Sequence, residues 1–243
     1  MKTLKLAALF IAAALSVASV KAQTADEIIS KHIEAIGGVD NWKKVASIVQ
    51  TGSISFNGME IAVVRTVLHN KGSRQDITLM GMNGYKIITP KEGWNFMPFQ
   101  GGQTAPEPIT DEDLKASQDE MDAQGSLFDY KAKGHTVEFL GKEDVDGTEC
   151  FKIKLTQKGG KAETYFFDPK TYYIVKSVSV VKPNGQEAEL TTTYSNYQKL
   201  AEGIFVPMNM GVPLGGPGMN ADLILSKVEI NKAVDESIFK PAK

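Results

Sequence analysis

The sequence predicts a mainly β protein of the α+β class, in which a curved antiparallel sheet forms a half-open barrel wrapped around one or two helices. Three observations support this prediction. Short alternating runs recur at regular spacing between turn sequences, as in sandwiches and open barrels. An opening amphipathic helix carries an apolar stripe that needs a concave partner. No composition shift or linker divides the chain, so residues 23–243 are expected to form a single β-barrel domain.

The first segment, residues 1–22, is expected to be a cleavable signal peptide. Lys2 and Lys5 give a positive start, and an uncharged apolar run follows over 6–20. A bilayer span needs roughly 20 apolar residues, so this shorter run favours cleavage before Gln23 over a membrane anchor. No cysteine follows the run that could be lipidated. We therefore expect the protein in the periplasm, with secretion as the alternative.

The charge of the expected mature chain limits its partners. Removal of 1–22 leaves 24 basic and 29 acidic residues, a net charge of −5. Nothing in the sequence suggests the basic surface that nucleic-acid binding requires, so no nucleic-acid partner is expected. The single Cys150 excludes an intramolecular disulfide and a cysteine-based metal site. Its strand-like neighbours favour a packed thiol, and the protein is expected to be a monomer.

The first expected helix begins at a capping box, in which Thr24 and Glu27 satisfy each other's backbone amides. Isoleucines at 28, 29, 33 and 36 give it one apolar stripe. Gly37 and Gly38 end the helix, because left-handed C-caps favour residues without a Cβ. Asp40 is expected to cap a second short turn that reaches Val45. Trp42, within that turn, is expected to anchor it to the core.

From Ser47 the apolar period changes from 3.6 to 2, which predicts strands. Asn57-Gly58 is a typical hairpin turn, and Asn83-Gly84 is expected to form the next. A long loop follows over 98–108, and its length suggests a lid. A helix of about 12 residues is then expected from Thr110, interrupted at Gly125. The strands expected in this half cover 48–56, 59–70, 73–80, 85–89 and 93–97.

The second half again reads as strands. Asp146-Gly147, Gly159-Gly160 and a turn with its proline at a favoured position, 168–171, separate them. A turn at 183–185 and a Gly/Pro-rich loop at 211–218 follow. Ten or eleven strands are expected in all, with a terminal turn at 235–239. The strands of this half cover 136–142, 150–157, 162–168, 172–181, 186–197, 204–208 and 221–230.

The sequence offers no catalytic pattern, so we expect no enzyme, metal or cofactor. His32, His69 and His135 lie in separate elements without ligand spacing, and His32 beside the apolar stripe is expected to be packed or half-exposed. No nucleophile elbow or P-loop occurs. The acidic residues 111–113 suit a helix N-terminus better than a metal site. A hydrolase is the weakest of the hypotheses considered.

Apolar and flexible side chains gather around the central short strands and the loop after them. Methionine adapts to irregular ligands because it is unbranched and polarizable. We expect such side chains, with Arg65, to line a hydrophobic cavity and its lid; the alternative is that they fill the core of a curved sheet. The candidate ligand-binding residues are Met80, Met82, Trp94, Phe96, Met97, Phe99, Leu127, Phe128 and Arg65.

Four segments carry a resemblance to a known family. They are the opening helix through Gly37-Gly38 with Trp42 and Ile48, the strand and turn at 165–172, the stretch 203–207, and the closing 231–239. Together they resemble the periplasmic outer-membrane lipoprotein-sorting proteins of the LolA/LolB-like superfamily, in a divergent form. The similarity extends over nearly all of the mature chain.

The resemblance implies a half-open barrel around helices, with an apolar cavity for lipoprotein acyl chains. Carriers of this family use an arginine inside the cavity to bond the lid. Arg65 is the candidate match, and Arg74 is the only other arginine of the chain.

Two function classes remain open. The first is a periplasmic binding or carrier protein for lipid or lipoprotein acyl chains in lipoprotein sorting. It would need only a dry cavity, because each buried CH₂ contributes about 0.8 kcal/mol. The alternative is a non-catalytic interaction or sensor module that contacts a transient membrane-protein partner. A filled interior would favour the alternative.

Overall fold

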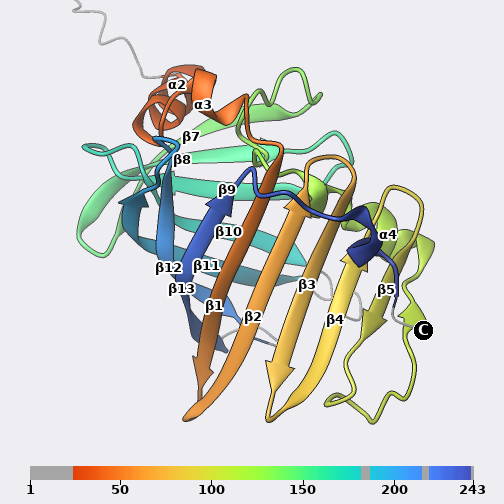
Figure 1. Cartoon of the computed structure of the whole chain (residues 1–243). Coiled ribbons are helices and arrows are strands. Elements are labelled where there is room, and N and C mark those ends of the chain that lie inside the picture. Colours follow the sequence, from red (N-terminus) through yellow and green to blue (C-terminus); the bar gives the residue numbers. More distant parts are fainter. Residues whose placement is uncertain (1–23, 182–186, 215–218, 242–243) are drawn as a thin grey trace, which may run out of the picture.

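The computed structural model describes residues 24–181, 187–214 and 219–241 (Figure 1). The expected signal peptide at 1–22 and the turn at 183–185 lie outside these residues, as do residues 215–218 of the expected loop at 211–218. Within the described residues, no helix combines the length and apolar character that crossing a bilayer requires.

One antiparallel sheet of 13 described strands dominates the molecule. Its spatial order is β6-β5-β4-β3-β2-β1-β13-β12-β11-β10-β9-β8-β7, so β6 and β7 are its two edges. The strands are β1 Ser47–Phe56, β2 Met59–Leu68, β3 Gly72–Leu79, β4 Met82–Ile88, β5 Gly93–Phe96, β6 Glu107–Pro108, β7 Thr136–Val145, β8 Thr148–Thr156, β9 Ala162–Phe167, β10 Ile174–Val181, β11 Ala188–Lys199, β12 Phe205–Pro213 and β13 Asn220–Ile230.

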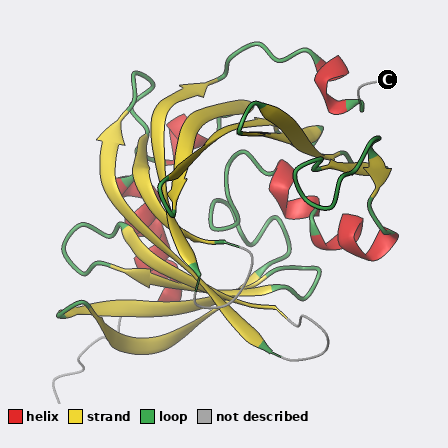
Figure 2. Ribbon diagram, turned by 90° about the horizontal axis from the view of Figure 1, so that it is seen from below, coloured by secondary structure: helices red, strands yellow, loops and turns green. Residues whose placement is uncertain are grey.

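Two meanders build this sheet, and the pairing of β1 with β13 joins them. The sheet curves without closing (Figure 2), which confirms the expected half-open antiparallel architecture. The chain between the two edge strands, residues 109–135, therefore runs from one edge of the sheet to the other. We call this segment the strap.

The helix α2 (Ala25–Ala35) confirms the expected capping box, with Thr24 and Glu27 bonding each other's backbone amides. The short α3 (Val39–Trp42) differs from expectation, because its N-cap is Gly38, without a side-chain cap bond, rather than Asp40. Trp42 is buried as expected, and its indole Nε1 donates to the carbonyl of Ile36 at 3.0 Å. This bond ties α3 to the end of α2.

The turn between β3 and β4 lies at Met80-Gly81, three residues before the expected Asn83-Gly84. Both turn residues have positive φ, 50° and 78°, as a tight hairpin requires. Gly84 instead lies inside β4, where a Cβ would come within 2.7 Å of the carbonyl oxygen of Phe96. The glycine thus serves close backbone approach rather than a turn.

The strap and the segment before it also differ from expectation. The segment expected as the loop 98–108 contains the two-residue strand β6, and the expected longer helix is broken into α4 (Asp111–Ala116) and the 3₁₀ helix η1 (Gln118–Met121). At the break, the amide of Ser117 donates to both Asp113 and Leu114 carbonyls, which tightens the turn. Contacts from the sheet to η1, described below, hold it in this position.

The main core lies between α2, the strap and the inner face of the second meander. It includes the apolar stripe of α2, Phe128 of the strap and Phe167 of β9. A smaller cluster forms on the other half of the sheet, where Tyr85 and Ile87 pack under Phe239 of the 3₁₀ helix η3 (Glu236–Phe239). The helix α2, the strap and the sheet therefore meet at the end of the half-open barrel that lies under α2.

Candidate hydrophobic binding site

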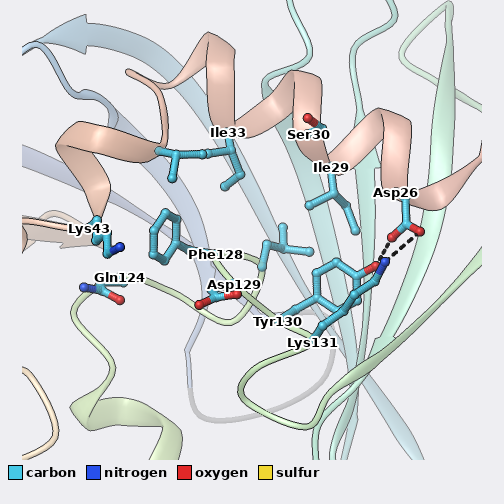
Figure 3. A pocket seen from close by; sticks show the side chains of 12 residues that line it. Asp26, Ile29, Ser30, Ile33, Lys43, Gln124, Phe128, Asp129, Tyr130 and Lys131 are labelled. Carbon is cyan, nitrogen blue, oxygen red and sulfur yellow. Dashed lines mark hydrogen bonds and ion pairs between the residues drawn. The ribbon is translucent and has the colours of Figure 1, made fainter.

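A groove of about 640 Å³ lies between α2 and residues 124–131 of the strap (Figure 3). Small-molecule sites typically enclose about 300–1,000 Å³, so the groove has the volume of a ligand site. Its lining comes from three elements, α2, α3 and the strap. The lining residues are Asp26, Ile29, Ser30, Ile33, Val39, Lys43, Gln124, Leu127, Phe128, Asp129, Tyr130 and Lys131.

The floor of the groove is apolar. Ile29 and Ile33 lie four residues apart and so point from the same face of α2. Phe128 faces them from the strap (Figure 3), Leu127 lines the same groove, and all four side chains are buried. Val39, at the rim, is 58% exposed. An apolar chain laid in the groove would therefore cover aliphatic and aromatic surface.

A second hollow of about 220 Å³ shares part of the lining of the groove. Ile33, Leu127 and Phe128 border both spaces. The second hollow is also bordered by Tyr194, whose pKa burial raises to about 12 and whose hydroxyl bonds Ser177 at 3.0 Å. Ile33, Leu127 and Phe128 therefore form the partition between the groove and the second hollow.

The strap segment that carries Leu127 and Phe128 is fixed on both sides. Gly125 and Asp129 take positive φ of 79° and 49°, which turns the chain before and after the two apolar residues. Lys133 Nζ donates to the carbonyl of Gly125 at 2.8 Å and pairs with Asp122 at 2.5 Å. The partition is therefore held by its own turns and by a short ion-pair contact.

One end of the groove is closed by a polar clasp between helix and strap. Asp26 accepts hydrogen bonds from the hydroxyl of Tyr130 and, at 2.9 Å, from Lys131. The Tyr130 bond first, and Lys131 second, hold the pKa of Asp26 below its ordinary value. The clasp ties the first turn of α2 to the strap beside the groove.

Arg65 lies in a polar row on the face of the sheet that the strap covers. Gln50, Arg65, Gln75 and Lys86 are directly paired across β1 to β4, so their side chains share one face. Arg65 donates from Nη1 to Oε1 of Gln50 at 3.3 Å and from Nη2 to the carbonyl of Glu120 at 3.1 Å.

Lys86 reinforces this attachment. Its ammonium lies 2.6 Å from the Glu120 carboxylate and 3.3 Å from the hydroxyl of Ser117. Arg65 and Lys86 therefore hold η1 against the first meander, so the strap is fixed to both halves of the sheet.

The expected cavity residues separate into four groups. Leu127 and Phe128 lie in the groove, and Arg65 contacts the strap at η1. The structure does not bring Met80 or Met82 to either hollow, because they lie at the β3–β4 turn with 80% and 43% exposure. A turn at the tip of a hairpin projects its side chains into solvent.

Trp94 and Phe96 pair with Ile87 and Tyr85 of β4 and pack in the cluster under η3. Successive strand residues point to opposite faces, so this cluster lies on the face away from Lys86 and the strap. Met97 and Phe99 lie against Gly84, where a Cβ would come within 3.0 Å of Met97 Sδ. None of the four lines the groove.

Sequence reasoning assigned the isoleucines of α2 to the core and did not connect them with a binding groove. It also passed over Ser30, Lys43 and Asp129, which border the groove, whereas Tyr130 was expected to return to the core or line a cavity. Only the helical spacing of Ile29 and Ile33 pointed toward this face. No local pattern links α2 to a strap almost a hundred residues later in the chain.

The described residues contain no group of three or more His, Cys, Asp or Glu side chains arranged to hold a metal ion. Cys150 is fully buried, and burial raises the pKa of its thiol, in agreement with the expected packed cysteine.

No protein-family model matches the chain, and no curated protein sequence matches it. Solved structures do share its fold. A DUF1329 family protein from Desulfovibrio piger superimposes with a TM-score of 0.57 at 13% identity, over 90% of this chain and 98% of that one. A LolA superfamily protein from Nitrosomonas europaea gives 0.58 at 15% identity, over 90% and 98%.

A domain from Vibrio parahaemolyticus assigned to outer-membrane lipoprotein sorting gives a TM-score of 0.54 at 14% identity, covering 88% of this chain and 94% of that domain. Such low identity carries the fold alone. At that level the expected resemblance is confirmed: the chain has the fold of LolA superfamily and lipoprotein-sorting structures.

Proposed function

We propose that this protein is a non-catalytic carrier that binds a hydrophobic chain, from a lipid or a lipoprotein, in the groove between α2 and the strap. One observation carries the proposal: four buried apolar side chains from two distant segments floor an accessible groove of about 640 Å³. The fold that the chain shares with a LolA superfamily protein supports it.

The energetics of such binding need no catalytic group. Each methylene removed from water contributes about 0.8 kcal/mol, so ten methylenes supply about 8 kcal/mol before the cost of ordering the chain. Release then requires a competing apolar site. We propose that a membrane or a transient membrane-protein partner provides it.

The compartment follows from the same proposal. Removal of the signal peptide at 1–22 would leave a monomeric carrier free in the periplasm, or secreted, and a role in outer-membrane lipoprotein sorting fits that location. The lipoprotein-sorting domain that shares the fold supports this role. N-terminal sequencing of the exported protein is expected to begin at Gln23, and an uncleaved N-terminus would contradict the proposal.

Arg65 has a specific role in this proposed mechanism. Its bond to the Glu120 carbonyl holds η1 to the sheet. The resemblance implies an arginine that bonds a lid, and we propose that η1, rather than the loop 98–108, is the segment that Arg65 bonds. We propose that this contact keeps the strap closed over the concave face and breaks when the strap moves to admit or release a chain.

A groove-filling substitution tests the proposal. Ser30 is exposed and borders the groove, so Ser30→Trp would place an indole in it without disturbing the buried stripe of α2. A fluorescent fatty-acid probe is titrated into the protein and displaced with palmitate. We expect displaceable binding that Ser30→Trp weakens at least tenfold.

The matched control is Glu34→Trp, which adds the same side chain to an exposed position of α2 outside the groove lining. It is expected to bind the probe like the wild type. Absence of displaceable binding in the wild type, or equal weakening in both variants, would contradict a carrier that uses this groove.

The alternative function, an interaction or sensor module, has its own supporting observation. Residues of the strap, including Leu127 and Phe128, already contribute to the main core against β8 and β9. A filled interior is what such a module requires. Capture of a defined membrane-protein partner by the lipid-free protein, with no probe binding, would favour this alternative.

A further inference from the structure

The groove carries four charged side chains, and they fall into two classes. Asp26 and Lys131 pair with each other at 2.9 Å, and Tyr130 also donates to Asp26. Within the described part of the chain, the ammonium of Lys43 and the carboxylate of Asp129 have neither a hydrogen bond nor an ion pair. One cation and one anion therefore remain available to a ligand.

These two groups lie on different walls of the groove. Lys43 directly follows α3, and Asp129 belongs to the strap just after Phe128 (Figure 3). Both residues are exposed, while the isoleucines and Phe128 between helix and strap are buried. The groove thus presents separate opposite charges at its surface and an apolar floor below them.

This arrangement of two opposite charges above an apolar floor favours some amphiphilic ligands over others. A purely anionic head group would be attracted by Lys43 but repelled by the carboxylate of Asp129. A purely cationic head group would be attracted by Asp129 but repelled by Lys43. A head with both charges satisfies both groups at once. Lysine binds phosphate as a point charge, and a carboxylate accepts hydrogen bonds from a primary ammonium.

We propose that the groove binds a single-chain zwitterionic phospholipid of the ethanolamine type. Its phosphate lies at Lys43, its ammonium at Asp129, and its acyl chain along Ile29, Ile33 and Leu127. This inference rests on the proposed carrier function and adds the chemistry of the head group to it.

The test compares three lipids that share one 16-carbon chain and differ in the head. They are lysophosphatidylethanolamine, lysophosphatidic acid and monopalmitoylglycerol, each used below its micelle concentration to displace the fluorescent fatty-acid probe. Two solvent-exposed ion pairs are expected to favour the zwitterion about fivefold to tenfold over both other lipids.

The variants are Lys43→Gln and Asp129→Asn, and Asn tolerates the positive φ of position 129. Each is expected to reduce the preference for the zwitterion to about twofold. Lys44→Gln is the control, because Lys44 is exposed and does not line the groove. It is expected to keep the wild-type preference.

The outcomes separate the two proposals. Equal binding of the three lipids, or strongest binding of the anionic lipid, overturns the head-group inference and leaves the carrier in place. Loss of preference in Lys44→Gln as well would also overturn it. Failure of every lipid to displace the probe overturns the carrier function itself.

Discussion

His32 is the polar side chain that lies deepest in the apolar face of α2. It is 4% exposed, and its Nδ1 lies 2.8 Å from the carbonyl of Tyr172, which fixes Nδ1 as the protonated nitrogen of the neutral ring. The ring also meets Phe167 edge-on at 5.2 Å. Burial lowers the pKa of His32 to about 4, and the bond to Tyr172 opposes this shift only in part.

This burial predicts a pH-dependent loss of stability. The unfolded chain takes up a proton at His32 near pH 6.5 and the native protein only near pH 4, so stability falls as the pH is lowered across this window. The expected loss attributable to His32 is about 3 kcal/mol. Urea unfolding of the wild type and His32→Gln at pH 7, 5.5 and 4 measures it.

The comparison with the variant removes the contribution of other groups that titrate in the same range, among them His135, whose pKa burial and Lys133 also lower. The wild type is expected to lose stability more steeply than His32→Gln. Parallel pH dependence in the two proteins would contradict this account of His32.

The residue-scale predictions from sequence succeeded where the environment was local. The capping box at Thr24 and the burial of Trp42 and Cys150 depend on near neighbours or strand alternation. The exposure of Met80 depends on which of two adjacent glycine-containing pairs forms the turn. Gly84 lies against Phe96 within β4 and therefore does not form the turn. No local sequence pattern reveals this contact.

The strap is the element on which the proposed mechanism depends. It joins the two edge strands of an open sheet and carries both the partition of the groove and η1. Its helix was predicted too long, because the sequence favours helix over this stretch while Arg65 and Lys86 draw Glu120 toward the sheet. Such tertiary contacts override local propensity.

Arg65 is expected to control the opening of the strap. Arg65→Met removes the bonds to Gln50 and to the Glu120 carbonyl, and loss of hydrogen bonds from a charged group is expected to cost about 1–3 kcal/mol of stability. Hydrogen exchange of the Glu120 and Asp122 amides, which bond within the strap, is expected to accelerate.

Arg74→Met provides the matched control. Arg74 pairs with Asp76 and donates to the carbonyl of Ile238 at η3, away from the strap. This variant is expected to leave exchange at Glu120 unchanged. Equal acceleration in both variants would mean that Arg65 contributes only to general stability and not to closure of the strap.

At the scale of the whole molecule, local turn chemistry predicted most of the sheet. Asn57-Gly58 and Asp146-Gly147 form the expected hairpins with positive φ at all four residues. The pairing of β1 with β13 joins segments that lie more than 160 residues apart, and alternation alone does not specify it. The groove likewise depends on contacts between segments that lie far apart in the chain. The packing of α2 against the strap therefore could not be predicted from sequence.

The fold is shared with solved structures at identities of 13% to 15%, so the proposed choice of ligand depends on the particular residues of the groove. Hydrophobic carriers on one fold can differ in head-group and chain contacts while keeping the sheet. In this chain the proposed contacts are the stripe of α2, the partition at Leu127 and Phe128, and the charges beside them.

The most direct measurement of the central claim is methyl NMR of isoleucine-labelled protein titrated with palmitate. The account predicts that the δ1 methyls of Ile29 and Ile33 shift as the fatty acid binds, while Ile224, which is 50% exposed on β13 and does not line the groove, stays unchanged. Shifts confined to Ile224, or no shift at Ile29 and Ile33 when the fatty acid is bound, would contradict binding between α2 and the strap.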